Sequence, residues 1–170
     1  TGAVRGGAGL VTAAFPECAY PAVASKLTSP LLLPVEYNET GTFSSDSADK
    51  IKSAIEKASS IVIGCGLGVN KDTATVLSEV IRNAEVPLVI DADGINIISR
   101  NINVLKVAKV PIILTPHPGE MSRLIGKTVQ AVQENRYQTA KKFALEYKVN
   151  LILKGADSID INEINTDDAN

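Results

Sequence analysis

The stretch VPIILTPHPGE, residues 110–120, combines the two features that decide the fold: an uninterrupted apolar run and an abrupt polar stop. Residues 110–114 show no alternation of polar and apolar side chains, which is typical of a strand buried on both faces of a parallel sheet. Two prolines then remove backbone donors and restrict the chain, so they end the strand and hold a loop. We therefore expect this loop to present His117, the only histidine of the chain, where the strand ends.

Further apolar runs of the same kind occupy residues 10–15, 61–63, 86–90 and 149–153. Between the runs lie apolar stripes at helical spacing: Ala48, Ile51, Ile55 and Ala58; Val76, Leu77, Val80, Ile81 and Ala84; and Val129, Val132, Ala140, Phe143, Ala144 and Tyr147. Asn70, and either Ser45 or Asp46, are expected to cap two of these helices. Strands separated by helical connections imply right-handed crossovers. The sequence thus predicts an α/β fold with a mostly parallel sheet flanked by helices on both faces.

Length and charge restrict the classes of protein. A chain of 170 residues suits one domain, and we expect residues 1–158 to form it, with 159–170 as a polar acidic tail. A net charge of −2 argues against a nucleic-acid or anionic-membrane partner. Two cysteines are too few for a disulfide framework, and no apolar run reaches the ~18 residues of a membrane helix. We expect a cytoplasmic protein, with a mitochondrial or other organellar location left open.

Polar or glycine-rich motifs follow directly after the predicted strands. They are GCGLG at 64–68, DADGIN at 91–96, TPHPGE at 115–120 and KGADS at 154–158. Ligands of open α/β sheets bind beyond the carboxyl ends of the strands. The motifs are therefore expected to meet at one rim of the sheet and to form a ligand site there.

The first two motifs each allow more than one interpretation. GCGLG lacks a glycine at Val69, so it fails as a dinucleotide fingerprint, but it suits a tight turn with positive φ. In DADGIN, either Asp91 or Asp93 would cap a helix while Asn96 faces solvent. The same carboxylates would alternatively organise water or magnesium near a phosphate, although two aspartates do not specify a metal site.

The other two motifs contain the candidate binding side chains. His117 is either a histidine satisfied by a loop carbonyl or a group that the restrained loop positions for a ligand, with Glu120 in the first turn of the next helix. Lys154 is either a solvated surface charge or, because it ends a strand and precedes Gly155, a partner for a nucleotide phosphate.

These motifs together carry a family resemblance. GAGLVT at 7–12, IGCGLG at 63–68, DADGIN at 91–96, LTPHPGEMSRLIG at 114–126 and LKGADS at 153–158 resemble the ADP- or ATP-dependent NAD(P)H-hydrate dehydratases in order and spacing. The resemblance covers nearly the whole chain, and PHPGE is its most specific part. It implies a ribokinase-like fold and a lyase that restores hydrated NADH or NADPH, with ATP or ADP hydrolysis driving the step and Mg²⁺ assisting.

The resemblance also implies site residues. Gly66, Gly68 and His117 would line the side of the site that holds the hydrated nicotinamide, and Ala3 in the opening TGA would contact the substrate more weakly. The adenine nucleotide would be held by Lys154, Gly155, Ala156, Asp157 and Ser158. No residue is implied as a metal ligand.

The chain departs from the family pattern at several points. Cys65 stands where the family usually has proline, and only residues 4–6 separate TGA from GAGLVT. The glycine-rich segment ending in Gly-Asp, which supplies the family's anion hole and catalytic aspartate, has no counterpart after KGADS, so the predicted fold is incomplete at the C-terminus. The catalytic residue is therefore unknown, and the role is given to none of Asp157, Asp160, Asp167 and Asp168.

Three functions follow from this pattern. The first is a dehydratase completed by sequence or a chain beyond these residues; the second is an inactive nucleotide- and substrate-binding remnant; the third is a small-molecule kinase of the same superfamily. PHPGE favours the dehydratase over the kinase, whereas the absent Gly-Asp segment favours the binding remnant. An incomplete fold would leave a sheet edge and helix faces uncovered, which predicts low stability or assembly into a homo-oligomer.

Overall fold

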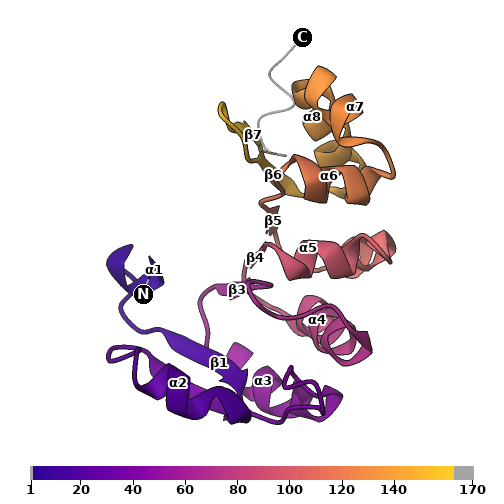
Figure 1. Ribbon diagram of the computed structural model, residues 1–170. Helices are drawn as coiled ribbons and strands as arrows, with labels where there is room; N and C mark the ends of the chain where they lie inside the picture. The colour runs from indigo at the N-terminus through magenta and orange to yellow at the C-terminus, as the bar shows by residue number, and fades with distance from the viewer. Residues whose placement is uncertain (1, 163–170) are drawn as a thin grey trace.

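A five-stranded sheet forms the centre of the fold in the computed structural model, which describes residues 2–162 (Figure 1). Its strands are β3 (Ile61–Ile63), β4 (Leu88–Ile90), β5 (Ile112–Leu114), β6 (Asn150–Leu153) and β7 (Ile159–Ile161), in that spatial order. The first four are mutually parallel, and β7 runs antiparallel to β6. The mostly parallel sheet expected from the apolar runs is confirmed.

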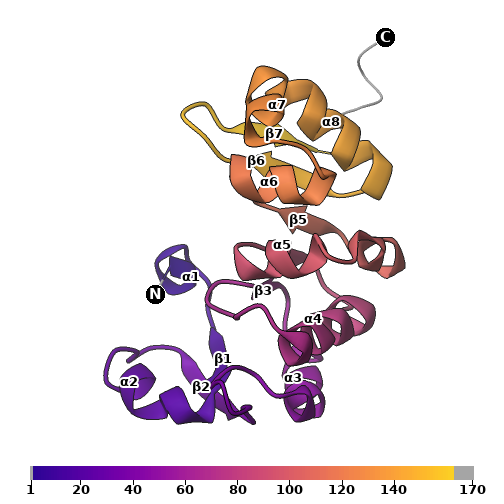
Figure 2. The ribbon, with the colours of Figure 1, turned by 45° about the vertical axis from the view of Figure 1, so that its right-hand side comes forward.

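Helices pack on one face of this sheet in both ribbon views (Figures 1 and 2). They are α4 (Lys71–Asn83), α5 (Asp93–Ile98), the 3-10 segment η3 (Ile102–Val107), α6 (Pro118–Ile125), α7 (Val129–Glu134) and α8 (Arg136–Tyr147). In β4, β5 and β6, alternate residues are no more than 1% exposed: Leu88, Ile90, Ile112, Leu114, Leu151 and Leu153. None of the helices within residues 2–162 is long and apolar enough to cross a membrane.

The opposite face of the sheet is less covered than the sequence leads us to expect. Val62, Val89 and Ile113 lie in register across β3, β4 and β5 on that face. Val62 is 67% exposed, and its two neighbours are only partly buried. The helices that were expected on both faces thus gather on one face of the described chain. Self-association through Val62, Val89 and Ile113 would bury this apolar surface. Homo-oligomer formation stays a prediction.

The N-terminal part forms a separate two-stranded parallel sheet of β1 (Thr12–Pro16) and β2 (Leu31–Val35). Its other elements are α1 (Gly2–Arg5), η1 (Glu17–Ala19), α2 (Tyr20–Ala24), η2 (Ser45–Ser47) and α3 (Ala48–Ile55). β1 lies close to the predicted strand 10–15, whereas β2 is not among the predicted strands. Pro34 obscures its pattern, and a proline is tolerated here because β2 pairs along only one edge.

One of the predicted helix caps is confirmed and the other is wrong. Asn70 caps α4: its side chain accepts the Thr73 N–H at 3.0 Å, and the Thr73 hydroxyl accepts the Asn70 N–H at 3.1 Å. The helix expected to be capped by Ser45 or Asp46 is α3, whose N-cap position is Ser47 with no side-chain cap hydrogen bond; the preceding η2 is capped by Ser44. The extended backbone of Ser44 leaves its hydroxyl oxygen free to accept the Asp46 N–H at 3.2 Å.

Two predicted boundaries also move. The single helical stripe over 129–147 is interrupted at Asn135, whose backbone (φ −138°, ψ 50°) is not helical, so the stripe becomes α7 and α8. Ile159–Ile161, assigned above to the polar tail, instead forms β7, and Ile161 is 6% exposed. The rest of the expected tail, from residue 163, lies outside the described residues, as do Asp167 and Asp168.

Candidate functional site

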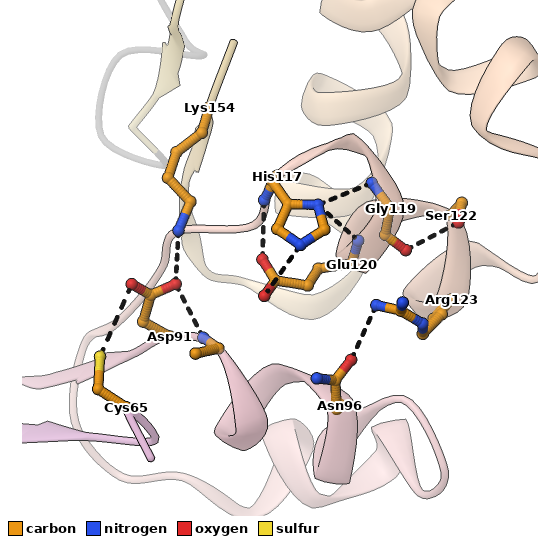
Figure 3. Close-up of polar contacts among 10 residues, drawn as sticks. Cys65, Asp91, Asn96, His117, Gly119, Glu120, Ser122, Arg123 and Lys154 are labelled. Atoms are coloured by element: carbon orange, nitrogen blue, oxygen red, sulfur yellow. Dashed lines mark hydrogen bonds and ion pairs between the residues drawn. The ribbon is translucent and has the colours of Figure 1, made fainter.

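The loops that follow β3 to β6 contact one another along one rim of the sheet (Figure 3). Parallel strands bring their carboxyl ends to the same edge. The Cys65 thiol lies 3.9 Å from an Asp91 carboxylate oxygen, and the Lys154 ammonium lies 2.7 Å from the other. The Lys154 N–H donates to the Pro116 carbonyl at 2.8 Å. The shared rim expected from the motifs is thus confirmed.

The glycine turn after β3 is bonded to the loop after β4. Gly64, Gly66 and Gly68 have φ values of 123°, 70° and 78°, a region that favours glycine, as the sequence predicts. A side chain on Gly64 would collide with the Asp91 carbonyl oxygen. The Gly68 N–H donates to the Asp93 carboxylate at 2.9 Å. The turn therefore holds its shape through contacts with the adjacent loop as well as through its own backbone.

The capping role predicted for the DADGIN aspartates is wrong. Helix α5 begins after Ala92, which has a φ of 50° and makes no side-chain cap. The Asp91 carboxylate accepts the Ala92 N–H at 2.8 Å, and Asp93 is bonded to the glycine turn. Asn96, expected to face solvent, is half-buried and accepts a hydrogen bond from Arg123 at 3.0 Å. The motif thus joins neighbouring loops instead of capping its own helix.

Lys154 forms an ion pair with Asp91, so it is not an isolated surface charge. The side chains of Lys154 and Asp91 are 40% and 26% exposed, which leaves part of the ammonium accessible at the rim. Partial burial raises the pKa of Asp91, but hydrogen bonds from Lys154, the Ala92 N–H and Thr115, together with the Lys154 charge, outweigh burial and lower that pKa below 3.8. Asp91 is consequently a carboxylate at neutral pH and holds the Lys154 side chain in place.

His117 is the N-cap of α6. Its Nδ1 accepts the Gly119 N–H at 3.0 Å and the Glu120 N–H at 3.4 Å, while the Glu120 carboxylate accepts the His117 N–H at 2.8 Å. The ring is therefore satisfied by helix donors and not by a loop carbonyl. Because Nδ1 is an acceptor, this network assigns the ring proton to Nε2, 3.4 Å from a Glu120 oxygen.

This cap limits how His117 can meet a ligand. Both ring nitrogens are engaged by Gly119 and Glu120, yet the side chain is 51% exposed. The rim therefore presents a half-exposed ring whose Nδ1 is already hydrogen-bonded. Glu120 is only 4% exposed, and the reciprocal arrangement is a capping box. The His-Pro-Gly-Glu spacing is the sequence signal that indicates this box, with histidine in the usual serine position.

Arg136, which the sequence analysis did not single out, contacts the KGADS loop. Its guanidinium donates to the carbonyls of Leu153, Lys154 and Asp157 at 3.3, 3.4 and 2.8 Å. Beyond Lys154, the loop residues are exposed: Gly155, Ala156, Asp157 and Ser158. No local pattern indicates this contact, because Arg136 precedes Asp157 by 21 residues.

Other candidate residues are not joined to the rim by these contacts. Ala3 is exposed on α1, and the hydrogen bonds of that segment connect residues 2–8 to one another. Asp160 is exposed on β7. Within residues 2–162, no group of three or more His, Cys, Asp and Glu side chains is placed to hold a metal ion.

Comparison with known proteins gives a consistent family. The NAD(P)H-hydrate dehydratase family matches residues 1–167. The bifunctional NAD(P)H-hydrate repair enzyme Nnr of Moorella thermoacetica is 36% identical over 159 residues, which are 94% of this chain and 30% of that protein. The ADP-dependent (S)-NAD(P)H-hydrate dehydratase of Neisseria meningitidis is 34% identical over 113 residues, covering 65% of this chain and 38% of that protein.

Solved structures agree on the architecture. The ADP/ATP-dependent NAD(P)H-hydrate dehydratase of Bacillus subtilis, co-crystallised with ATP/Mg²⁺, superposes with a TM-score of 0.71 at 25% identity, over 95% of this chain and 53% of that one. A ribokinase-like superfamily protein of Enterococcus faecalis has a TM-score of 0.77 at 18% identity, over 94% of this chain and 52% of its own, which supports the fold alone. The chain therefore spans about half of these solved chains and 30% of the Moorella relative. With the family match over residues 1–167 and the motif loops gathered at one rim, the chain belongs to the NAD(P)H-hydrate dehydratase family.

Proposed function

We propose that this chain takes part in the nucleotide-dependent dehydration of hydrated NADH or NADPH, which returns the working cofactor. The observation that carries the proposal is the direct contact between the two predicted binding loops. The Lys154 N–H of the nucleotide loop donates to Pro116, the residue before His117, at 2.8 Å. A reaction between a nucleotide and a hydrated nicotinamide needs both molecules at one place.

The chemistry explains why two ligands must meet. Hydroxide is a poor leaving group, so direct loss of water from the hydrated ring is slow. If the ring hydroxyl attacks the terminal phosphorus of ATP or ADP, the hydroxyl becomes a phosphate ester and ADP or AMP departs. The ring C–O bond then breaks with loss of phosphate, a proton leaves the neighbouring ring carbon, and the double bond of the reduced nicotinamide is restored.

The rim residues have separate roles in this proposal. Lys154 offers its partly exposed ammonium to the nucleotide phosphates, while Asp91, ionised at neutral pH, fixes the direction of that ammonium. The glycine turn at Gly66 and Gly68, open at Gly66, and the half-exposed His117 ring would border the hydrated nicotinamide. Since Nδ1 of His117 caps its own helix and Nε2 lies 3.4 Å from a Glu120 oxygen, we assign His117 to substrate contact and not to proton transfer.

Magnesium enters this proposal with the nucleotide. Mg²⁺ is commonly bound through one or two carboxylates together with substrate phosphates. At the rim, Asp91 is paired with Lys154, and Asp93 accepts the Gly68 N–H. These contacts, and the lack of a three-ligand cluster within residues 2–162, do not fit a preformed protein site for the ion. We therefore assign Mg²⁺ no side-chain ligand among residues 2–162.

The test is recovery of the near-ultraviolet absorbance of reduced nicotinamide from NADH hydrate. The folded chain is incubated with NADH hydrate and Mg²⁺, with ATP, with ADP or without nucleotide. Growth of the band only when nucleotide is present supports the proposal. A flat trace from a folded sample that binds ATP or ADP contradicts activity of the isolated chain and supports the binding-remnant alternative.

A further inference from the structure

We propose that Arg136 is the positioning residue of the nucleotide loop 154–158, and that position 155 is glycine because the Arg136 guanidinium fills the space that a side chain would need. The nature of the ligand rests on the proposed function. The ordering of the loop by Arg136 does not, because it depends only on contacts within the chain.

The Arg136 guanidinium donates hydrogen bonds to three carbonyl oxygens of one short segment. Arg136 is the first residue of α8, and its Nη2 donates to Leu153, Lys154 and Asp157 at 3.3, 3.4 and 2.8 Å. Its Nη1 donates to the Gln133 side chain at 3.0 Å, which fixes the orientation of the planar group. A lysine ammonium has no such fork, so it cannot reproduce the same set of contacts.

These contacts set the direction of the loop amides. In a trans peptide the N–H points opposite to the preceding carbonyl, and the described residues contain no cis peptide. The Leu153 carbonyl faces Arg136, and the next N–H, that of Lys154, points to Pro116. By the same geometry, the carbonyls of Lys154 and Asp157 direct the following N–H groups, those of Gly155 and Ser158, away from the guanidinium. Backbone N–H groups turned outward in a loop are suited to bind phosphate oxygens.

Gly155 supplies an independent observation. A Cβ built on this residue would lie 2.5 Å from both Nη atoms of Arg136 and 2.8 Å from the guanidinium carbon. Gly155 is not among the positive-φ residues, so the backbone itself accepts alanine. An alanine at position 155 must therefore push the flexible arginine side chain away, and the three carbonyl contacts would be lost. The two residues form a matched pair.

The positive charge of Arg136 also favours a phosphate ligand at this loop. Its hydrogen-bond partners are neutral oxygens, from three carbonyls and the Gln133 amide. Within residues 2–162 the ion pairs involve other cations, so no carboxylate of this part of the chain neutralises Arg136 at salt-bridge distance. The loop thus carries a positive guanidinium behind it in addition to the Lys154 ammonium, which favours a polyphosphate over a neutral ligand.

A double-mutant cycle tests the pairing. The variants are Arg136→Met, Gly155→Ala and the two combined, and the dissociation constants of ATP and ADP are measured by titration calorimetry. Each single variant is expected to weaken nucleotide binding about tenfold, the loss of one or two hydrogen-bonding contacts. The double variant is expected to bind no more weakly than Arg136→Met, because the same contacts are lost only once. The proposal would be overturned if the losses of affinity in the two single variants multiplied in the double variant. It would also be overturned if Gly155→Ala bound nucleotide as tightly as the unmodified chain.

Two further variants separate positioning from general effects. Arg82→Met, which removes a 61%-exposed arginine of α4, is the matched charge control and should bind nucleotide normally. Arg136→Lys keeps the charge but lacks the forked guanidinium. The nucleotide affinity that it recovers relative to Arg136→Met therefore measures the contribution of charge to binding. The affinity for the hydrated dinucleotide should stay unchanged in all of them. An equal loss for both ligands would indicate a folding role and contradict the proposal.

The role of Arg136 can also be tested without nucleotide, by measuring the hydrogen-exchange rates of the amides of residues 154–158. This measurement does not depend on the proposed function. Faster exchange in Arg136→Met and in Gly155→Ala, with no further increase in the double variant, supports loop ordering even if the unmodified chain binds neither ATP nor ADP. In that case the proposed function fails while the role of Arg136 stands. Unchanged exchange in both single variants would overturn the role of Arg136.

Discussion

The five-stranded sheet and the β1–β2 sheet both contain parallel apolar strands, yet helices cover their strands to very different extents. In the larger sheet, Leu88 and Leu114 are both 0% exposed beneath the helices. In the smaller one, Phe15 of β1 and Val35 of β2 are the buried strand residues, and Leu31 is 55% exposed. Because helices bury a strand face of the larger sheet, we expect that sheet to be the more stable part of this molecule.

The same difference applies to the site. The rim loops of the larger sheet are connected to one another through Asp91 and Lys154, whereas the hydrogen bonds of the segment around Ala3 are local. A binding group must be held by neighbouring structure to keep its geometry. We accordingly rank His117 and residues 154–158 above Ala3 as candidate contacts.

The largest predicted effect is in the core of the larger sheet. Leu114→Ala removes a fully buried side chain and should lower the free energy of unfolding by about 2–5 kcal/mol. Leu31→Ala, the same change at the 55%-exposed first residue of β2, should alter it by no more than about 0.5 kcal/mol. Urea unfolding of both variants measures the contrast. Similar losses of unfolding free energy in the two variants would contradict the contrast between the sheets, because they would mean that β2 contributes as much stability as β5.

A smaller effect is expected at helix caps in the two regions. His117→Ala removes the cap of α6 and should cost about 1 kcal/mol of stability. Ser44→Ala, at the three-residue η2, should cost about 0.5 kcal/mol or less. Thermal melts of the two variants provide the measurement.

Asparagine at position 117 is the matched control, because it is a preferred cap without the imidazole ring. His117→Asn should keep the stability of α6 while weakening binding of the hydrated dinucleotide and leaving nucleotide binding unchanged. If His117→Asn binds both ligands normally, His117 is a cap alone and not a substrate contact.

The smallest effect is expected at ion pairs, and it depends on pH. Because the pKa of Asp91 is lowered in the folded state, its pair with Lys154 stabilises the fold above pH 3.8 and this contribution is lost as the pH falls through the folded-state pKa. Asp91→Asn should therefore remove this part of the acid sensitivity. Glu36→Gln breaks the exposed Lys50–Glu36 pair, 3.8 Å apart beside β2, and should change little. Unfolding curves at neutral pH and below pH 3.8 distinguish them; parallel curves for Asp91→Asn and the unmodified chain would show that the rim pair is unimportant.

Local patterns explain why much of the larger sheet is predictable. The runs at 61–63, 110–114 and 149–153 contain strands because uninterrupted apolar residues need burial on a sheet. The positive φ values of the GCGLG glycines and the Asn70 cap follow from residues close in sequence. β2 is not predicted from its local pattern because Pro34 interrupts the apolar run. The predicted DADGIN caps are wrong because Asp91 and Asp93 bond to other loops.

The sequence by itself determined the parallel strands, the glycine turn, the restrained loop at His117 and the family, since each depends on residue types within a few positions of one another. Only the tertiary structure decided how these parts act together. Lys154 meets Asp91 across 63 residues of chain, and Arg136 reaches the carbonyl of Asp157 across 21. The physical reason is that a long charged side chain takes whichever oxygen the packed strands and helices bring within hydrogen-bonding distance, and no local pattern encodes that choice.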